Sequence, residues 1–269
     1  MSLNWMDVSD VSFNALLLLE RVQLNWFPKW DFPEPEISQA LAANPAVVWY
    51  LRHKAPEIVP WVDAKLAEAA ELAAKNPPLS PEAVRQAEVA VLRSMEDLMV
   101  YALDPSIYDA QPFLGWDSGE LTGCVDFSGK TVLDIGSGTG RLAFVAAPLA
   151  KVVFPVEPVA NLRDYLRKKA ARLGFTNVYP VDGTITSIPF PDCFTDVVMS
   201  GHVYGDDPEA EVREMERVTR PGGMVILCPG TNDEEGPAQQ YLVEQGFEWS
   251  RFYEPRDGWK RKFWKIVDK

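Results

Sequence analysis

The chain has 269 residues, enough for one large domain or for one domain with a sizeable attachment. It is 47% hydrophobic and 24% charged, as soluble globular proteins are, and its longest early apolar run, residues 15–19, is too short for a membrane span or a signal peptide. A net charge of -13 disfavours nucleic acid as a partner, while three scattered cysteines and two histidines disfavour disulfides and a metal site.

From these totals we expect a cytoplasmic protein that neither inserts into a membrane nor holds a metal. The acidic charge is concentrated in the first 120 residues, which carry 18 acidic and 8 basic side chains. Such a surface would repel a phosphate backbone, so DNA or long RNA is not the expected substrate.

The first 120 residues have the periodicity of helices and no convincing strand. Apolar residues recur at helical spacing over residues 9–26, 36–51, 57–75 and 83–102, with a predicted break at Asn44 and Pro45. Ser80 followed by Pro81 is typical of a helix start. The sequence therefore predicts an all-α domain over residues 1–120, ending in an aromatic connector at 108–121.

From residue 129 onward, short apolar runs alternate with helical patterns. We expect strands at 132–135, 152–156, 178–181, 194–199 and 224–228, then a hairpin of 246–253 and 260–267 joined by a turn at 255–258. This alternation predicts an α/β domain over residues 121–269, with a doubly wound, mostly parallel seven-stranded sheet that ends in a C-terminal antiparallel hairpin.

Residues 132–140 combine a strand with a glycine-rich turn. Val132, Leu133 and Ile135 suit a buried parallel strand, and Gly-Ser-Gly-Thr-Gly follows directly. Glycine is needed where the backbone adopts positive φ or where a ligand approaches closely. The pattern predicts a nucleotide-binding loop; the alternative is a flexible loop in which Asp134 caps the next helix.

Chemistry-bearing side chains follow the ends of several predicted strands. Asp134, Glu157, Asp182 and His202 all lie at or near such ends, and Glu157 follows Gly136 by 21 residues. Open α/β sheets bind ligands beyond the carboxyl ends of their strands, and a carboxylate at this distance can reach ribose hydroxyls. Each acid alone could equally cap a helix.

The residue at position 141 separates two classes of ligand. A dinucleotide fingerprint would need glycine there, but the chain has Arg141. Asp134 would repel a diphosphate and attract an ammonium group. The loop therefore favours a nucleoside that carries an amino acid over a dinucleotide.

These residues resemble the motifs of class I S-adenosylmethionine-dependent methyltransferases, strongly over residues 129–228 and more loosely in the hairpin. Residues 132–140 look like the first motif, and residues 188–192 and 214–223 resemble the approaches to the fourth and fifth strands. The resemblance implies a Rossmann-like fold, S-adenosylmethionine as cofactor, and a set of residues that bind it. That set is Asp134, Gly136, Ser137, Gly138, Gly140, Glu157, Asp182, Gly183, Thr184 and Ser200.

Two further groups of residues are candidates for acceptor binding and proton transfer. We expect Tyr108, Phe113 and Trp116 to form a lid over the sulfonium, because aromatic faces suit a cation, although they could simply join the two domains. His202 and Tyr204 are candidate general bases. Residues 1–120 would then act as the cap that selects the substrate, since such attachments usually supply specificity in this family.

The resemblance implies in-line transfer of the sulfonium methyl group to a small-molecule acceptor. That reaction depends mainly on alignment and on exclusion of water. Two alternatives stay open: a non-catalytic S-adenosylmethionine sensor, and a nicotinamide-dependent oxidoreductase, which Arg141 disfavours.

Overall fold

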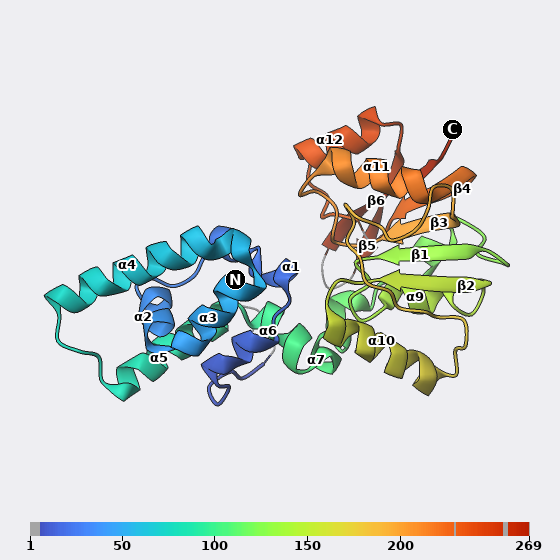
Figure 1. Cartoon of the computed structure of the whole chain (residues 1–269). Coiled ribbons are helices and arrows are strands. Elements are labelled where there is room, and N and C mark those ends of the chain that lie inside the picture. Colours follow the sequence, from blue (N-terminus) through green and yellow to red (C-terminus); the bar gives the residue numbers. More distant parts are fainter. Residues whose placement is uncertain (1–5, 229, 255–257, 269) are drawn as a thin grey trace. The chain divides into compact units, whose positions relative to one another are not determined.

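The computed structural model describes residues 6–228, 230–254 and 258–268. The chain folds into two compact units, Met1–Tyr108 and Asp109–Lys269 (Figure 1). Most of the turn expected at 255–258 falls outside the described residues.

The regular elements assigned in the described part of the first unit are helices. They are η1 (Phe13–Leu18), α1 (Arg21–Leu24), η2 (Phe27–Lys29), α2 (Glu36–Ala43), α3 (Pro45–Lys54), η3 (Pro56–Ile58), α4 (Val59–Lys75), α5 (Pro81–Ser94) and α6 (Glu96–Leu103), followed by α7 (Pro105–Asp109). They bury a core of their own, in which Phe13, Leu41 and Met99 are fully enclosed. All members of this cluster come from the first unit, so its helices are held together by burial of their own apolar side chains.

Two helix predictions need correction and two are confirmed. Residues 9–26 form the 3-10 helix η1 and the short α1, because Glu20 is extended and its side chain caps α1 together with Gln23. Residues 83–102 are divided between α5 and α6 at Met95. The start of α5 is as predicted, since Ser80 Oγ accepts a hydrogen bond from the Ala83 amide at 3.2 Å, and α2 and α3 part at Asn44.

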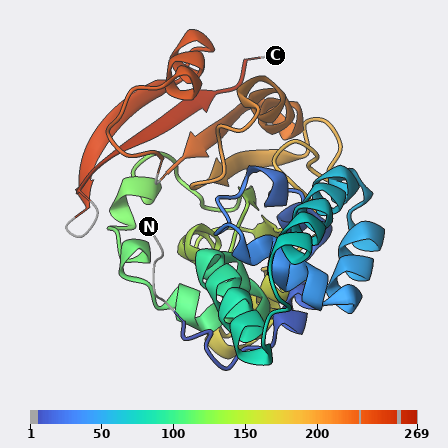
Figure 2. The ribbon, with the colours of Figure 1, turned by 90° about the vertical axis from the view of Figure 1, so that its left-hand side faces the viewer.

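The second unit is built on one mixed sheet. Its strands are β1 (Thr131–Ile135), β2 (Val152–Val156), β3 (Thr195–Ser200), β4 (Thr219–Leu227), β5 (Glu248–Glu254) and β6 (Gly258–Ile266), in the order β2-β1-β3-β4-β6-β5. The first four strands are parallel, and β6 is antiparallel to both β4 and β5. Figure 2 shows β5 and β6 side by side as the long red strands. The predicted Rossmann-like sheet and C-terminal hairpin are therefore present.

Helices cover both faces of this sheet (Figure 1). They are α8 (Gly119–Thr122), α9 (Arg141–Ala146), α10 (Ala160–Leu173), α11 (Pro208–Val218) and α12 (Pro237–Glu244). Alternate residues of a strand point to opposite faces, so Val132 packs with α9 while its neighbour Leu133 packs in the cluster that includes α11 and α12. Each face of the parallel strands is consequently buried, which explains their continuous apolar runs.

The sheet has six strands among the described residues, not the seven predicted, because 178–181 is not a continuous strand. Its residues run parallel to β2 as two isolated bridges, Val153 with Val178 and Val156 with Val181. Four backbone hydrogen bonds join the two segments, but Pro155 has no amide hydrogen to donate between them. The ladder is therefore interrupted at its middle.

Residues 109–120 pack with the second unit. Trp116 is 3% exposed, and it lies in the same buried cluster as Leu121, Phe127 and Ala143 of α9. Trp116 and Leu121 of the aromatic connector thus form part of the core beside β1 and α9.

Candidate active site

The carboxyl ends of β1, β2 and β3 lie level with one another. Ile135 pairs with Val156 on one side and with Ser200 on the other. The chain leaves β1 for β2 on one side and later returns to β3 on the other, so the strand order reverses at β1. Such a reversal opens a crevice beyond the strand ends, which is where open α/β sheets bind ligands.

The glycine loop begins at this crevice with an unusual backbone. Gly136, Gly138 and Gly140 have φ values of +66°, +53° and +86°, which side-chain-bearing residues rarely adopt. A Cβ atom on Gly136 would lie 2.5 Å from Val203 Cγ1, and one on Gly140 would lie 2.6 Å from Leu166 Cδ2. Both the positive φ values and the close approach of neighbouring side chains therefore explain why glycine is needed at these positions.

Replacing Gly140 with alanine should destabilise the protein more than the same change at Gly174. Both glycines have positive φ, but a Cβ atom at Gly174 meets nothing within 4 Å. We expect Gly174→Ala to cost about 1 kcal/mol from backbone strain alone, and Gly140→Ala about 3 kcal/mol because it also crowds Leu166 and Phe144. Urea unfolding of the two variants measures the difference; equal losses would show that the loop is not tightly packed.

Asp134 is buried at 1% exposure beside the loop. Its Oδ2 accepts a hydrogen bond from the Ala143 amide in the first turn of α9 at 2.9 Å, and Ser137 Oγ donates to its main-chain oxygen at 2.6 Å. Burial raises the pKa of Asp134 to about 7. Asp134 thus caps α9, as the alternative interpretation expected, and its contact with a ligand stays a prediction.

Glu157 connects the end of β2 to the glycine loop. Its Oε2 accepts from the Gly138 amide and its Oε1 from the Val159 amide, both at 2.9 Å. Burial also raises the pKa of Glu157 to about 7. Two backbone donors therefore fix the orientation of this carboxylate at the crevice.

Asp182 lies further out than the other two acids. Its carboxylate is exposed and pairs with Arg163 at 2.9 Å, and the same Arg163 nitrogen donates to the main-chain oxygen of Glu157 at 2.7 Å. Arg163, which was not among the residues predicted from the sequence, thereby links Asp182 to the end of β2.

Gly183 follows Asp182 and leads into a tight turn that runs from Thr184 to Ser187. A Cβ atom on Gly183 would lie 2.6 Å from Pro189 Cδ, and the main chains of Thr184 and Ser187 bond to each other in both directions. On the far side of β1, Ser200 is fully buried and donates from Oγ to the Ile135 carbonyl at 3.0 Å. Ser200 therefore holds β1 and β3 together at the crevice.

The loop after β3 carries the two candidate bases. His202 is exposed and has a φ of +64°, a conformation that histidine adopts more readily than most residues. Tyr204 donates from Oη to the Ala238 carbonyl at 3.0 Å, and burial raises the pKa of its phenol. A phenol so engaged is a poor proton acceptor, which leaves His202 as the better candidate.

A cavity of about 260 Å³ lies beyond the ends of β3 and β4. It is lined by Ser200, His202, Tyr204, Leu227, Gly230, Thr231, Asn232, Leu242 and Phe263. Thr231 Oγ1 is buried there without a hydrogen-bond partner among the described residues. A buried hydroxyl without a partner is costly, so a ligand or water is expected to complete it.

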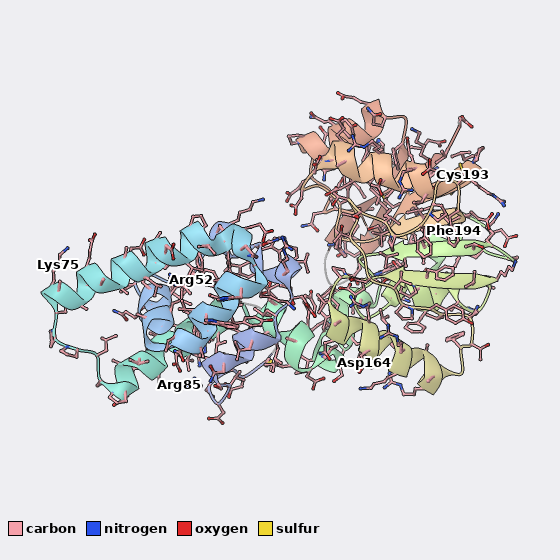
Figure 3. The ribbon with its side chains drawn as sticks, in the orientation of Figure 1. Arg52, Lys75, Arg85, Asp164, Cys193 and Phe194 are labelled. Atoms are coloured by element: carbon pink, nitrogen blue, oxygen red, sulfur yellow. The ribbon has the colours of Figure 1, made fainter. Side chains whose placement is uncertain are left out.

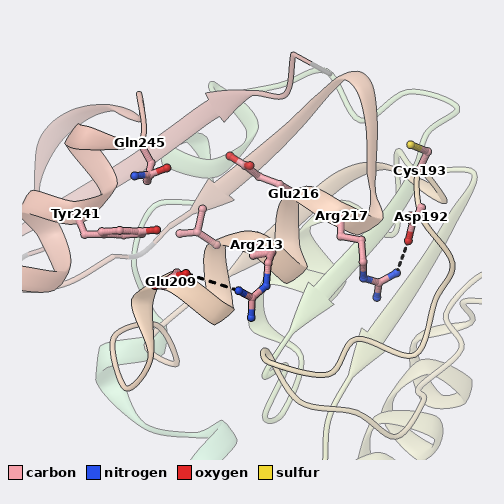
Figure 4. A pocket seen from close by; sticks show the side chains of 9 residues that line it. Asp192, Cys193, Glu209, Arg213, Glu216, Arg217, Tyr241 and Gln245 are labelled. Carbon is pink, nitrogen blue, oxygen red and sulfur yellow. Dashed lines mark hydrogen bonds and ion pairs between the residues drawn. The ribbon is translucent and has the colours of Figure 1, made fainter.

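A second hollow, of about 520 Å³, lies at the other end of the sheet (Figure 4). Cys193 and Phe194, labelled in Figure 3, directly precede β3 and so mark its amino end. The charged groups around this hollow are paired, Arg217 with Asp192 at 2.9 Å and Arg213 with Glu209 at 3.7 Å. We assign it no part in the site at the carboxyl ends.

The residues expected to form a lid are divided between the two units. Tyr108 belongs to the first unit, where its ring packs against Tyr101 at 5.0 Å between centroids. The Trp116 ring is buried, with the Arg141 guanidinium 4.6 Å from its centroid, and Phe113 is partly exposed in η4 (Pro112–Leu114). Trp116 therefore supports the core, and the lid function stays a prediction.

Arg141 stabilises the connector, a role that was not predicted from the sequence. Its guanidinium donates to the main-chain oxygens of Leu114 and Trp116, each at 2.6 Å. The first residue of α9 thereby holds the connector against the end of the glycine loop.

The described residues 6–228, 230–254 and 258–268 contain no cluster of three or more metal-ligating side chains. Over the same residues, no helix has the length and apolar character needed to cross a membrane.

Residues 133–227 match the protein family described as "Methyltransferase domain". The malonyl-[acyl-carrier protein] O-methyltransferase of Yersinia pestis is 34% identical over 123 residues, or 44% of each protein. Its namesake from Serratia marcescens is 32% identical over 142 residues, or 50% of this chain and 54% of the relative. The chain thus spans about half the length of the curated relatives it matches.

Solved structures with a similar arrangement include a SAM dependent methyltransferase from Aquifex aeolicus. It matches 61% of this chain and 99% of its own length, with 19% identity and a TM-score of 0.48.

Proposed function

Because residues 133–227 form a class I methyltransferase domain, for which S-adenosylmethionine is the expected cofactor, we propose that this chain methylates a small, neutral acceptor. The observation that carries the proposal is the juxtaposition, at one crevice, of a glycine cradle, two buried carboxylates and a cavity.

The residues at the crevice fit this cofactor. Gly136, Gly138 and Gly140 leave the space that side chains would fill, and Glu157 offers acceptors suited to ribose hydroxyls. Asp134 places a carboxylate where an ammonium group would neutralise it. Asp182, Gly183 and Thr184 are the candidates for the adenine end, because they follow the segment beside β2.

S-adenosylmethionine, when bound, supplies a methyl group on a sulfonium that a nucleophile displaces in line. The protein therefore needs to align the acceptor and exclude water more than it needs reactive side chains. The buried floor of the crevice, formed by Asp134 and Ser200, suits that task because it is already dehydrated.

We assign the acceptor to the cavity of about 260 Å³. Its described lining contains no lysine or arginine, and it combines the apolar Leu227, Leu242 and Phe263 with hydrogen-bonding groups such as Thr231 Oγ1. An uncharged acceptor with one polar group would fit the apolar part of this lining better than an anion, since an anion would lose more hydration there.

The malonyl-[acyl-carrier protein] O-methyltransferases suggest a second candidate, a carboxylate carried on a protein. The sequence match favours it, while the uncharged cavity lining and the acidic first 120 residues favour the neutral acceptor. An assay with labelled S-adenosylmethionine separates the two: we expect transfer to neutral hydroxyl or phenol compounds, and transfer only to malonyl-[acyl-carrier protein] would reverse the assignment.

His202 is the candidate general base for this transfer, and its replacement by glutamine tests that role. If His202 removes the acceptor proton, His202→Gln should lower kcat about a hundred-fold, with cofactor affinity unchanged. Full turnover across pH 6 to 9 would exclude the role.

The helical unit is the candidate for acceptor selection. It has its own core, and the first 120 residues carry 18 acidic and 8 basic side chains. A non-catalytic sensor of S-adenosylmethionine is the other function this organisation would allow; methyl transfer to any acceptor excludes it.

A further inference from the structure

Lys169 on α10 is a nearly buried lysine that points toward the glycine loop. Its side chain is only 14% exposed. It follows Leu166 by one helical turn, and Leu166 is the residue that a Cβ atom on Gly140 would strike. A lysine side chain is rarely buried to this extent unless its ammonium group is paired.

The ammonium group of Lys169 has two partners at hydrogen-bond distance. Nζ lies 2.6 Å from Asp109 Oδ1 and donates to the Thr139 carbonyl oxygen at 3.0 Å. It also lies 5.0 Å from the centroid of the Phe144 ring. Hydrogen bonds from a charged donor in so enclosed a place are stronger than neutral ones.

The Thr139 carbonyl needs an external donor. Thr139 is 1% exposed and stands between Gly138 and Gly140, both with positive φ. Thr139 precedes Gly140, the N-cap of α9, so its carbonyl lies outside the helical hydrogen-bond pattern, and the nearby Ala143 amide donates to Asp134. Lys169 is the donor to this carbonyl.

Asp109 holds the lysine from the other side. Its Oδ1 accepts from Lys169, and its Oδ2 accepts from Tyr165 Oη at 2.8 Å. Asp109 is also the first residue of the second unit. The same carboxylate thus neutralises Lys169 and anchors the point where the chain enters this unit.

We propose that Lys169 is a positioning residue that holds the Thr139–Gly140 peptide in its cofactor-binding conformation, with Asp109 and Tyr165 keeping the ammonium group in place. Gly138 and Gly140, on either side of Thr139, would give this loop a large conformational freedom if Lys169 did not hold it. The effect on the cofactor rests on the proposed function, whereas the effect on the loop does not.

The experiment compares Lys169→Met with Lys168→Met. Lys168 is the adjacent residue, but its side chain is 76% exposed and pairs with Asp164, labelled on α10 in Figure 3. We expect amide hydrogen exchange of residues 136–141 in the ligand-free protein to accelerate about ten-fold in Lys169→Met and to be unchanged in Lys168→Met. Calorimetry should show S-adenosylhomocysteine binding about ten-fold more weakly to Lys169→Met only.

Three outcomes decide the proposal. Unchanged exchange of residues 136–141 in a folded Lys169→Met overturns it, as does an equal acceleration across all of α10 and β1, which would show a merely structural role. Lys169→Arg, which keeps the charge and the donor, should restore most of the protection. If Lys169→Met does not fold, Asp109→Asn should accelerate exchange of the same residues by a smaller factor, about three-fold, and unchanged exchange in that variant overturns the proposal.

Failure of the wild-type chain to bind S-adenosylhomocysteine would count against the proposed function alone. The exchange measurement would still decide whether Lys169 positions the loop, because it uses no ligand.

Discussion

Replacing Glu157 by alanine is expected to weaken the binding of S-adenosylhomocysteine about a hundred-fold. The carboxylate is fixed by the Gly138 and Val159 amides, and each oxygen has a second lone pair for a ribose hydroxyl. A hydrogen bond to a charged group contributes about 1.5 to 3 kcal/mol, so loss of two gives at least this change. Isothermal calorimetry measures it.

Two acids provide the controls for this experiment. Asp182→Asn should weaken binding only a few-fold, because Asp182 is exposed and its interactions are screened by water. Asp164→Asn, on the outer face of α10, should have no effect. A folded Glu157→Ala variant with wild-type affinity would refute the assignment of Glu157 to the cofactor.

Cofactor binding should weaken steeply below neutral pH. Asp134 and Glu157 have pKa values raised to about 7 by burial, so both are largely protonated in the free protein at pH 6. An ammonium group beside Asp134 favours the ionised form, and binding must then release a proton. We expect the Kd of S-adenosylhomocysteine to rise about ten-fold per pH unit between pH 6.5 and 5.5 for one proton released.

The stability of the ligand-free protein should change in the opposite direction. A carboxyl whose pKa is raised by folding stabilises the protein fully below its unfolded value, near 4, and this contribution is lost as pH rises through 7. Asp134→Asn should remove the contribution of Asp134 to the pH dependence of the Kd and to the pH dependence of stability, while the contribution of Glu157 remains. A wild-type Kd that stays constant from pH 5.5 to 8 would contradict the predicted ionisation of Asp134.

The parallel part of the sheet and the glycine loop could be predicted because local chemistry determines them. The apolar runs that become β1 and β2, and the glycines after Ile135, are short-range signals. The resemblance they carry is confirmed by the family match over residues 133–227. The interrupted pairing of residues 178–181 with β2 could have been predicted only from Pro155, which lies opposite this segment and has no amide hydrogen to donate.

Several contacts around the glycine loop could not be predicted because they join residues distant in sequence. Asp109 and Lys169 are 60 residues apart, and the pairing emerges only when α10 packs against the loop. The available signal was a lysine on the inward side of a helix whose Leu162 and Leu166 are buried. Likewise, an aromatic residue such as Trp116 suits a lid, but the structure buries it in the core. Its burial depends on the tertiary fold and could not be predicted from the local sequence.

The central claim is that the crevice at β1 binds an amino-acid-bearing nucleoside and transfers its methyl group. Calorimetric titration of the whole chain with S-adenosylhomocysteine, and separately with NAD, tests it most directly. We predict saturable binding of one S-adenosylhomocysteine per chain and no heat of binding with NAD, because Arg141 occupies the third glycine position of a dinucleotide site. Binding of NAD, or of neither compound, would contradict the claim.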